Sequence, residues 1–129
     1  MHSKYYSIKT RTSDGKVFDS MKEARRYEQL LLLSKAGEIT DLQCQVKFEL
    51  LPAQYETYER YSKTGERLKD GRRLLERGID YVADFAYIDK NGERIVEDTK
   101  GFKRGAAYQI FTIKRKLMYS IHGIRIKEV

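Results

Sequence analysis

Two aspartates and a lysine, in two apolar segments joined by a short turn, are the residues of this chain best suited to chemistry. Asp84 lies within the apolar run 79–88, and Asp98 and Lys100 follow the shorter apolar run after the turn. Carboxylate oxygens are hard ligands that select Mg²⁺ or Mn²⁺. This chemistry requires that the fold bring the two carboxylates together.

The turn between the two segments decides whether they meet. Asp89 and Gly92, at its first and fourth positions, are typical of a type I turn, and in a three-residue hairpin loop Gly92 takes the left-handed position. Asp89 then lies opposite Glu93, which places Asp84 opposite Asp98. Two carboxylates about 5 Å apart on neighbouring strands repel each other unless a cation lies between them. A two-residue Asn-Gly loop would instead shift the register and place the carboxylates on opposite faces.

Alternation along the second strand separates its neighbouring charges. Lys100 shares the face of Asp98, whereas Glu97 points to the other face. The alternative to a metal site is a solvated edge pair in which Lys100 is a simple counter-charge. Asp84 argues against that alternative, because an aspartate inside a buried strand needs a partner.

A helix predicted over residues 20–35 supplies a third acid. Glu23 lies within its apolar stripe, where its carboxylate would face the sheet as a third group of the metal site. The alternative is that Glu23 only completes a capping box with Ser20. The predicted stripe is Ala24, Tyr27, Leu30 and Leu31, and the opposite side carries Lys22, Arg25, Arg26 and Gln29.

A second helix, predicted over residues 106–121, carries Lys114 in the middle of its apolar stripe. Such a lysine either extends to the edge of the stripe or reaches a phosphate or a water molecule beside the carboxylates. The predicted stripe is Ala107, Ile110, Phe111, Ile113, Leu117, Met118 and Ile121.

The whole chain of 129 residues, positions 1–129, is predicted to be one α/β domain with a mixed sheet. Residues 1–17 form an arm or a short hairpin, and strands are predicted at 42–51, at 123–129 and at the two apolar segments. A basic, tyrosine-rich insert at about 53–77 has turns at Gly65 and Gly71.

Composition limits the possible partners. The net charge of +7 favours a polyanion, with nucleic acid first and an anionic membrane surface second. No apolar run approaches the ~18 residues of a spanning helix. His2, His122 and the single Cys44 lie far apart in sequence, which makes a zinc site of histidine and cysteine unexpected.

Five ordered segments resemble a known family: "FDSMKEARRYEQL", "GEITDLQCQVKFELLP", "YVADFAY", "VEDTKG" and "IKRKLMYSIHGIRIKEV". With the motif Asp84…Asp98-Thr99-Lys100, the chain resembles the PD-(D/E)XK nuclease superfamily. More closely, it is similar to small phage and prophage endonucleases of the Holliday-junction-resolvase type. The resemblance covers most of residues 18–51 and 81–129.

The resemblance implies a restriction-endonuclease-like fold and cleavage of branched DNA with Mg²⁺ or Mn²⁺, in the cytoplasm of a bacterial host. It implies that Asp84 and Asp98 bind the metal, that Glu23 completes the site, and that Lys100 orients or activates the attacking water. Gln45 would approach the site as an accessory group. The chain departs from the pattern at Ala83, where a proline is usual, and at 102–109, from which no residue is carried over.

Two paired cuts in a four-way junction require a two-fold dimer, so we expect a homodimer. We expect the insert to grip branched DNA through its tyrosines and basic residues; the alternative is a solvated hairpin balanced by its own acids.

The rival to the endonuclease is a non-catalytic DNA-binding protein of the same fold whose carboxylates are structural.

Overall fold

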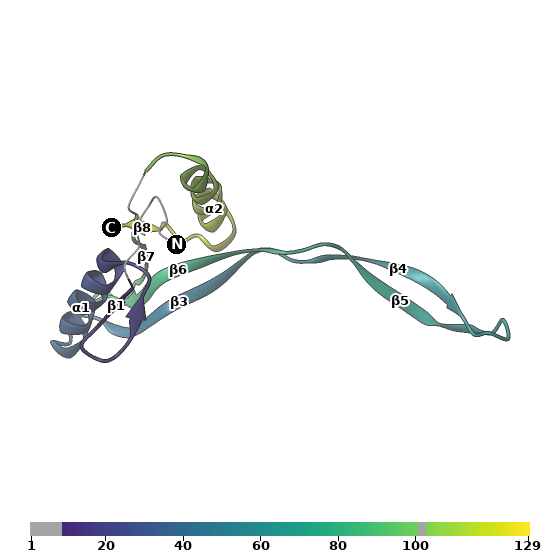
Figure 1. Cartoon of the computed structure of the whole chain (residues 1–129), viewed down its shortest axis with the longest axis horizontal. Helices are drawn as coiled ribbons and strands as arrows, with labels where there is room; N and C mark the ends of the chain where they lie inside the picture. The colour runs from purple at the N-terminus through teal and green to yellow at the C-terminus, as the bar shows by residue number, and fades with distance from the viewer. Residues whose placement is uncertain (1–8, 101–102) are drawn as a thin grey trace.

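A mixed sheet with a helix on either side forms the body of the protein (Figure 1). The structure is a computed structural model that describes residues 9–100 and 103–129. The sheet order is β3-β6-β7-β8, with β8 parallel to β7 and the other pairs antiparallel, so the predicted α/β class is confirmed. The elements are β1 (Thr10–Arg11), β2 (Val17–Phe18), α1 (Met21–Lys35), β3 (Thr40–Leu51), β4 (Gln54–Tyr61), β5 (Arg67–Glu76), β6 (Ile79–Ile88), β7 (Arg94–Asp98), α2 (Ala106–His122) and β8 (Lys127–Glu128).

Helix α1 begins and packs as its sequence predicts. The Ser20 hydroxyl accepts a hydrogen bond of 3.1 Å from the Glu23 backbone N–H, which caps the first turn. Ala24, Tyr27 and Leu30 are buried against the sheet. They form one apolar cluster with Phe18, Ile39, Phe85 and Tyr87.

Helix α2 buries a narrower face than the sequence predicts. Only Phe111 and Met118 are buried, whereas Ile110, Ile113 and Ile121 are about half exposed, at 56%, 60% and 49%. The predicted stripe is therefore wrong at these isoleucines and at the exposed Ala107. The physical reason is the small surface beneath α2, where the last strand is much shorter than the predicted 123–129. Gly123 ends α2 in the left-handed conformation, and only Lys127–Glu128 pairs with β7.

The insert forms a long two-stranded ribbon, β4–β5, that projects away from the body (Figure 1). Its turn contains Gly65, as predicted, at φ +87°. The turn predicted at Gly71 is wrong, because Gly71 lies inside β5 opposite Tyr58. A Cβ at Gly71 would come within 2.3 Å of the Tyr58 ring, so the glycine makes room for that ring to cross the ribbon.

The N-terminal segment contains the expected short hairpin. Strands β1 and β2 pair antiparallel, and Thr12 N–H donates to the Lys16 carbonyl across the turn at 2.8 Å. Residues 1–8 of the predicted arm lie outside the described residues. No helix in the described ranges is long and apolar enough to cross a membrane.

Candidate active site

The β6–β7 hairpin has the three-residue loop on which the carboxylate pairing depends. Asp89 N–H donates to the Glu93 carbonyl at 2.9 Å, and Gly92 N–H donates to the Asp89 carbonyl at 3.1 Å, with Gly92 at φ +79°. The strands pair Phe85 with Glu97. The next residues along the two strands are Asp84 and Asp98, so the predicted register is confirmed and the shifted one is wrong.

Fixed hydrogen bonds hold each carboxylate in place. Asp84 Oδ2 accepts from the backbone N–H of Thr99 at 2.8 Å and from its hydroxyl at 2.7 Å. Asp98 Oδ2 accepts from the Tyr81 hydroxyl at 2.8 Å and lies 3.1 Å from Lys100 Nζ. Asp98 is only 6% exposed, so little water competes for these bonds.

The pair carries more negative charge than its surroundings neutralise. Burial raises the pKa of Asp98 to about 6, and hydrogen bonding with Asp84 and repulsion from it act in the same direction. The Tyr81 hydroxyl and Lys100 oppose that rise only in part. Two acids in such a contact favour either a shared proton or a cation between them.

Glu23 joins this cluster from the first turn of α1. Burial raises the pKa of Glu23 to about 7, helped by repulsion from Asp84, Asp19 and Asp98, while Lys100 lowers it. Among the described hydrogen bonds, the Glu23 carboxylate accepts none from the Ser20 backbone N–H. The helix cap is thus made by the serine, and the Glu23 carboxylate is left to interact with the acids of the sheet.

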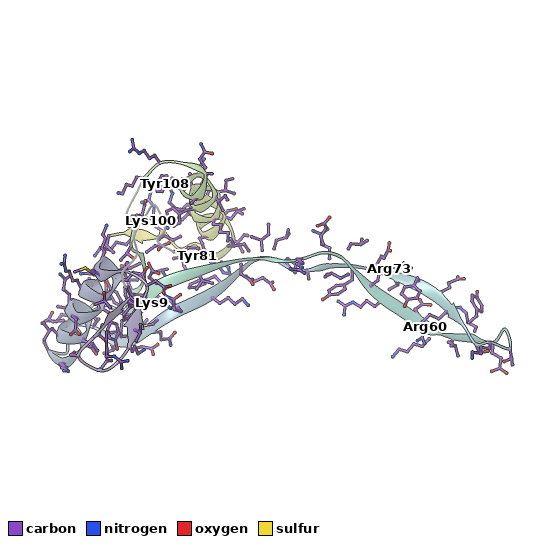
Figure 2. All side chains as sticks on the ribbon, viewed as in Figure 1. Lys9, Arg60, Arg73, Tyr81, Lys100 and Tyr108 are labelled. Carbon is purple, nitrogen blue, oxygen red and sulfur yellow. The ribbon has the colours of Figure 1, made fainter. Side chains whose placement is uncertain are left out.

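Lys100 is positioned by both the sheet and α2. Its Nζ lies 3.7 Å from the centroid of the Phe111 ring and 3.1 Å from Asp98. The aromatic face and the carboxylate together confine the ammonium group. Lys100 and Tyr81 lie in the body, far from Arg60 and Arg73 on the ribbon (Figure 2).

Glu97 belongs to a different network on the face of the sheet toward α1. Its side chain is fully buried and accepts from Arg26 Nε and Nη2, both at 2.7 Å, and from the Tyr87 hydroxyl. Although burial alone raises the pKa of Glu97, the bonds from Arg26 and Tyr87 hold it below its usual value. The predicted opposite orientation of Glu97 and Asp98 is confirmed.

Gln45 lies next to Asp84 in the sheet. The β3–β6 register pairs Cys44 with Phe85 and Val46 with Ala83, which places Gln45 opposite Asp84. Its backbone has φ +53°, a left-handed conformation that costs a non-glycine residue free energy.

Gln45 and Glu23 line one pocket of about 460 Å³, together with residues of the N-terminal hairpin. The structure therefore places the predicted accessory glutamine near the predicted third acid.

Lys114 is half-buried on α2. In the described part of the chain, no hydrogen bond or ion pair joins it to the carboxylates. Its proposed contact with a phosphate or a water molecule stays a prediction.

The three carboxylates suit a hard divalent cation, although they do not form a complete metal site in this structure. Within the described residues, no three acidic, histidine or cysteine side chains are arranged to hold a metal ion. Burial, together with repulsion from neighbouring acids, nevertheless raises the pKa values of Glu23 and Asp98, and carboxylate oxygens are the ligands that Mg²⁺ prefers. Asp84, Asp98 and Glu23 are therefore the residues that fit the ion.

Sequence reasoning missed two residues that orient the site. Thr99 is the unspecified residue of the Asp-x-Lys motif, and nothing in its type indicated that it holds Asp84. Tyr81 lies on β6 at a position that alternation assigns to the opposite face from Asp84, yet its hydroxyl reaches Asp98. The one available signal was that a buried tyrosine hydroxyl needs a partner.

Residues 2–127 match the family described as "Protein of unknown function (DUF1064)", and the chain belongs to this family. No match was found among curated proteins or among solved structures.

Proposed function

We propose that this protein is a divalent-metal-dependent DNA endonuclease of the Holliday-junction-resolvase type, a member of the PD-(D/E)XK superfamily. The observation that carries the proposal is the side-by-side placement of Asp84 and Asp98, with Lys100 Nζ 3.1 Å from Asp98. Asp98 has little exposure, and burial and its contact with Asp84 both raise its pKa. Function-bearing sites are where such uncompensated acids are expected.

In this proposal Asp84, Asp98 and Glu23 hold the ion. When bound, Mg²⁺ or Mn²⁺ polarises a phosphoryl oxygen and lowers the pKa of water. Hydrogen bonds from Thr99 to Asp84 and from Tyr81 to Asp98 limit the rotation of the two carboxylates, which are in contact with each other. Lys100, confined by Asp98 and Phe111, orients the attacking water or the scissile phosphate.

The ribbon supports branched DNA as the substrate. Arg72 lies over the Tyr55 ring at 3.6 Å, and Arg73 over the Tyr58 ring at 4.4 Å, so cations and aromatic faces are presented together. An isolated two-stranded ribbon is only marginally stable in water and gains from a surface to bind. Guanidinium groups contact phosphates, and tyrosine rings stack on unpaired bases at a branch point.

A homodimer would place two such sites on one junction and thereby permit paired cuts. Light scattering of the free protein and of its junction complex tests this part of the proposal.

Cleavage of a labelled four-way junction in Mg²⁺, compared with linear duplex and with EDTA, tests the activity itself. The proposal expects Mg²⁺-dependent cutting that is lost in Asp98→Asn. Tight junction binding with no cutting in Mg²⁺ or Mn²⁺ would favour the rival, a DNA-binding protein with structural carboxylates.

A further inference from the structure

One face of α1 carries a stripe of polar residues that the catalytic cluster does not use. Lys22, Arg25, Arg26 and Gln29 are spaced three and four residues apart, so they share one face of the helix. This face lines a pocket of about 280 Å³ together with Thr99 and Val129.

Within residues 9–100 and 103–129, two of the three cations in this pocket have no acidic partner. Arg26 is neutralised by Glu97. The Lys22 ammonium donates to the Lys100 backbone carbonyl, a neutral group, and so keeps its full charge. Arg25 is exposed, and within residues 9–100 and 103–129 no hydrogen bond or ion pair engages its guanidinium. The pocket therefore has a net positive charge with donors available.

The pocket adjoins the candidate active site at two points. Thr99 lines the pocket and also donates both of its hydrogen bonds to Asp84. Lys22 precedes Glu23 in the first turn of α1, so a cation of the pocket and an acid of the site follow one another in the chain. An anion bound in the pocket would therefore lie next to a phosphate group that is cleaved at the carboxylates.

We infer that the pocket of Lys22, Arg25 and Gln29 binds a backbone phosphodiester of the DNA strand next to the scissile phosphate. A guanidinium and an ammonium group with unused donors match the charge and the oxygen acceptors of a phosphodiester. The inference rests on the proposed function, because it assumes a polynucleotide substrate. It makes Arg25 a substrate-binding residue that sets the register of the strand.

Binding measured in EDTA tests the inference without requiring cleavage. Arg25→Gln is compared with wild type and with Lys35→Gln, which removes an exposed charge from the last turn of the same helix. We expect Arg25→Gln to weaken DNA affinity about tenfold. We also expect its plot of log affinity against log salt to be shallower by about 0.9, the loss of one phosphate contact. Lys35→Gln should match wild type in both quantities.

Neutral methylphosphonates, placed singly along the DNA strand, locate the contact. Wild type should lose affinity at one position beside the cut site, and Arg25→Gln should lose none there, because the two changes remove the same interaction. Equal salt slopes for the two proteins, or identical methylphosphonate profiles, would overturn the inference.

Inorganic phosphate tests whether the pocket binds the free ion and not the DNA strand. If phosphate raises the melting temperature of wild type but not of Arg25→Gln, while their DNA salt slopes are equal, the pocket does not serve the strand and the inference is overturned. Failure of the proposed function has a different result: DNA binds with the expected Arg25 dependence but is never cut in Mg²⁺.

Discussion

Arg26 and Glu97 form a bidentate ion pair that joins α1 to β7, with both N–O distances at 2.7 Å. Glu97 directly precedes Asp98 on β7, and Arg26 follows Glu23 by three residues on α1. It therefore fixes the two elements that carry acids of the candidate site. Glu97 is fully buried, and Tyr87 donates a further bond to it.

Glu97→Gln should lower the free energy of unfolding by about 3 kcal/mol, because it leaves the Arg26 guanidinium beside a neutral group in a buried place. Urea unfolding monitored by circular dichroism measures the change. At temperatures where the variant is folded, its Mg²⁺-dependent cleavage should stay within a few fold of wild type. A folded but inactive Glu97→Gln protein would show that Glu97, and not only Asp98, belongs to the chemistry.

Asp98→Asn should have the opposite effects, a large loss of cleavage and a small gain of stability. Cleavage should fall by about a thousandfold, since a charged ligand of the ion is lost. The stability of the metal-free protein should rise by about 1 kcal/mol, because the repulsion from Asp84 is relieved. Asp84→Asn is expected to behave in the same way. Full cleavage by both variants in Mg²⁺ would refute the assignment of these residues.

Local sequence rules predicted the elements that position the site. Asp89 and Gly92 were sufficient to set the hairpin loop, and the loop then determined that Asp84 lies opposite Asp98. Ser20 likewise marked the start of α1. In each case the determining interactions are between residues close in the chain, where turn and capping preferences act directly.

Contacts between distant segments could not be predicted in the same way. The sequence placed Arg26 on the outer side of α1, yet its long side chain reaches Glu97 and is 80% buried, because the buried acid needs a cation. Helical periodicity assigned Ile113 to the core, but the sheet beneath α2 is too small to cover it. Both errors concern how much surface the tertiary structure provides, which the period of a helix does not encode.

Metal-free protein should lose stability as the pH rises from about 5 to about 8. The folded pKa is about 7 for Glu23 and about 6 for Asp98, against ordinary values of 4.5 and 3.8. Groups with a raised folded pKa stabilise the fold fully below their ordinary pKa, and that contribution is lost as the pH rises through the folded pKa. Thermal unfolding in EDTA across this range measures the effect.

Saturating Mg²⁺ should reduce this loss, since the ion binds the ionised carboxylates and stabilises the fold at the alkaline end. Asp98→Asn in EDTA is the control and should show a shallower decline. A wild-type protein that gains stability between pH 5 and pH 8 in EDTA would contradict the described electrostatics of the acid cluster.

Lys100→Ala should impair the chemical step more than DNA binding. Its ammonium group is confined between Asp98 and the Phe111 ring, where it is placed to act on the reacting groups. Single-turnover cleavage at saturating DNA should slow by about a hundredfold. Affinity measured in EDTA should change by less than about threefold, as for the exposed Lys35→Ala. A large loss of affinity with an unchanged single-turnover rate would reduce Lys100 to a phosphate contact.

Shortening the ribbon should remove the preference for branched DNA while leaving the site intact. Tyr55 pairs with Leu74 across β4 and β5, so residues 56–73 can be replaced by Asn-Gly, a two-residue loop that suits a hairpin. The shortened protein should cut linear duplex at the wild-type rate, because the carboxylates and Lys100 lie in the body (Figure 2). Its affinity for a four-way junction should fall by about tenfold or more, since base-stacking tyrosines and phosphate-binding arginines are removed.

A double substitution, Arg72→Gln with Arg73→Gln, tests the same surface with the ribbon kept. It should produce part of the loss of affinity for a four-way junction, and the salt dependence of junction binding should be shallower. Unchanged junction preference in the shortened protein would show that the ribbon is an ordinary solvated hairpin. Light scattering of both proteins, free and on the junction, measures the subunit count, and a monomer in both states would refute the expected homodimer.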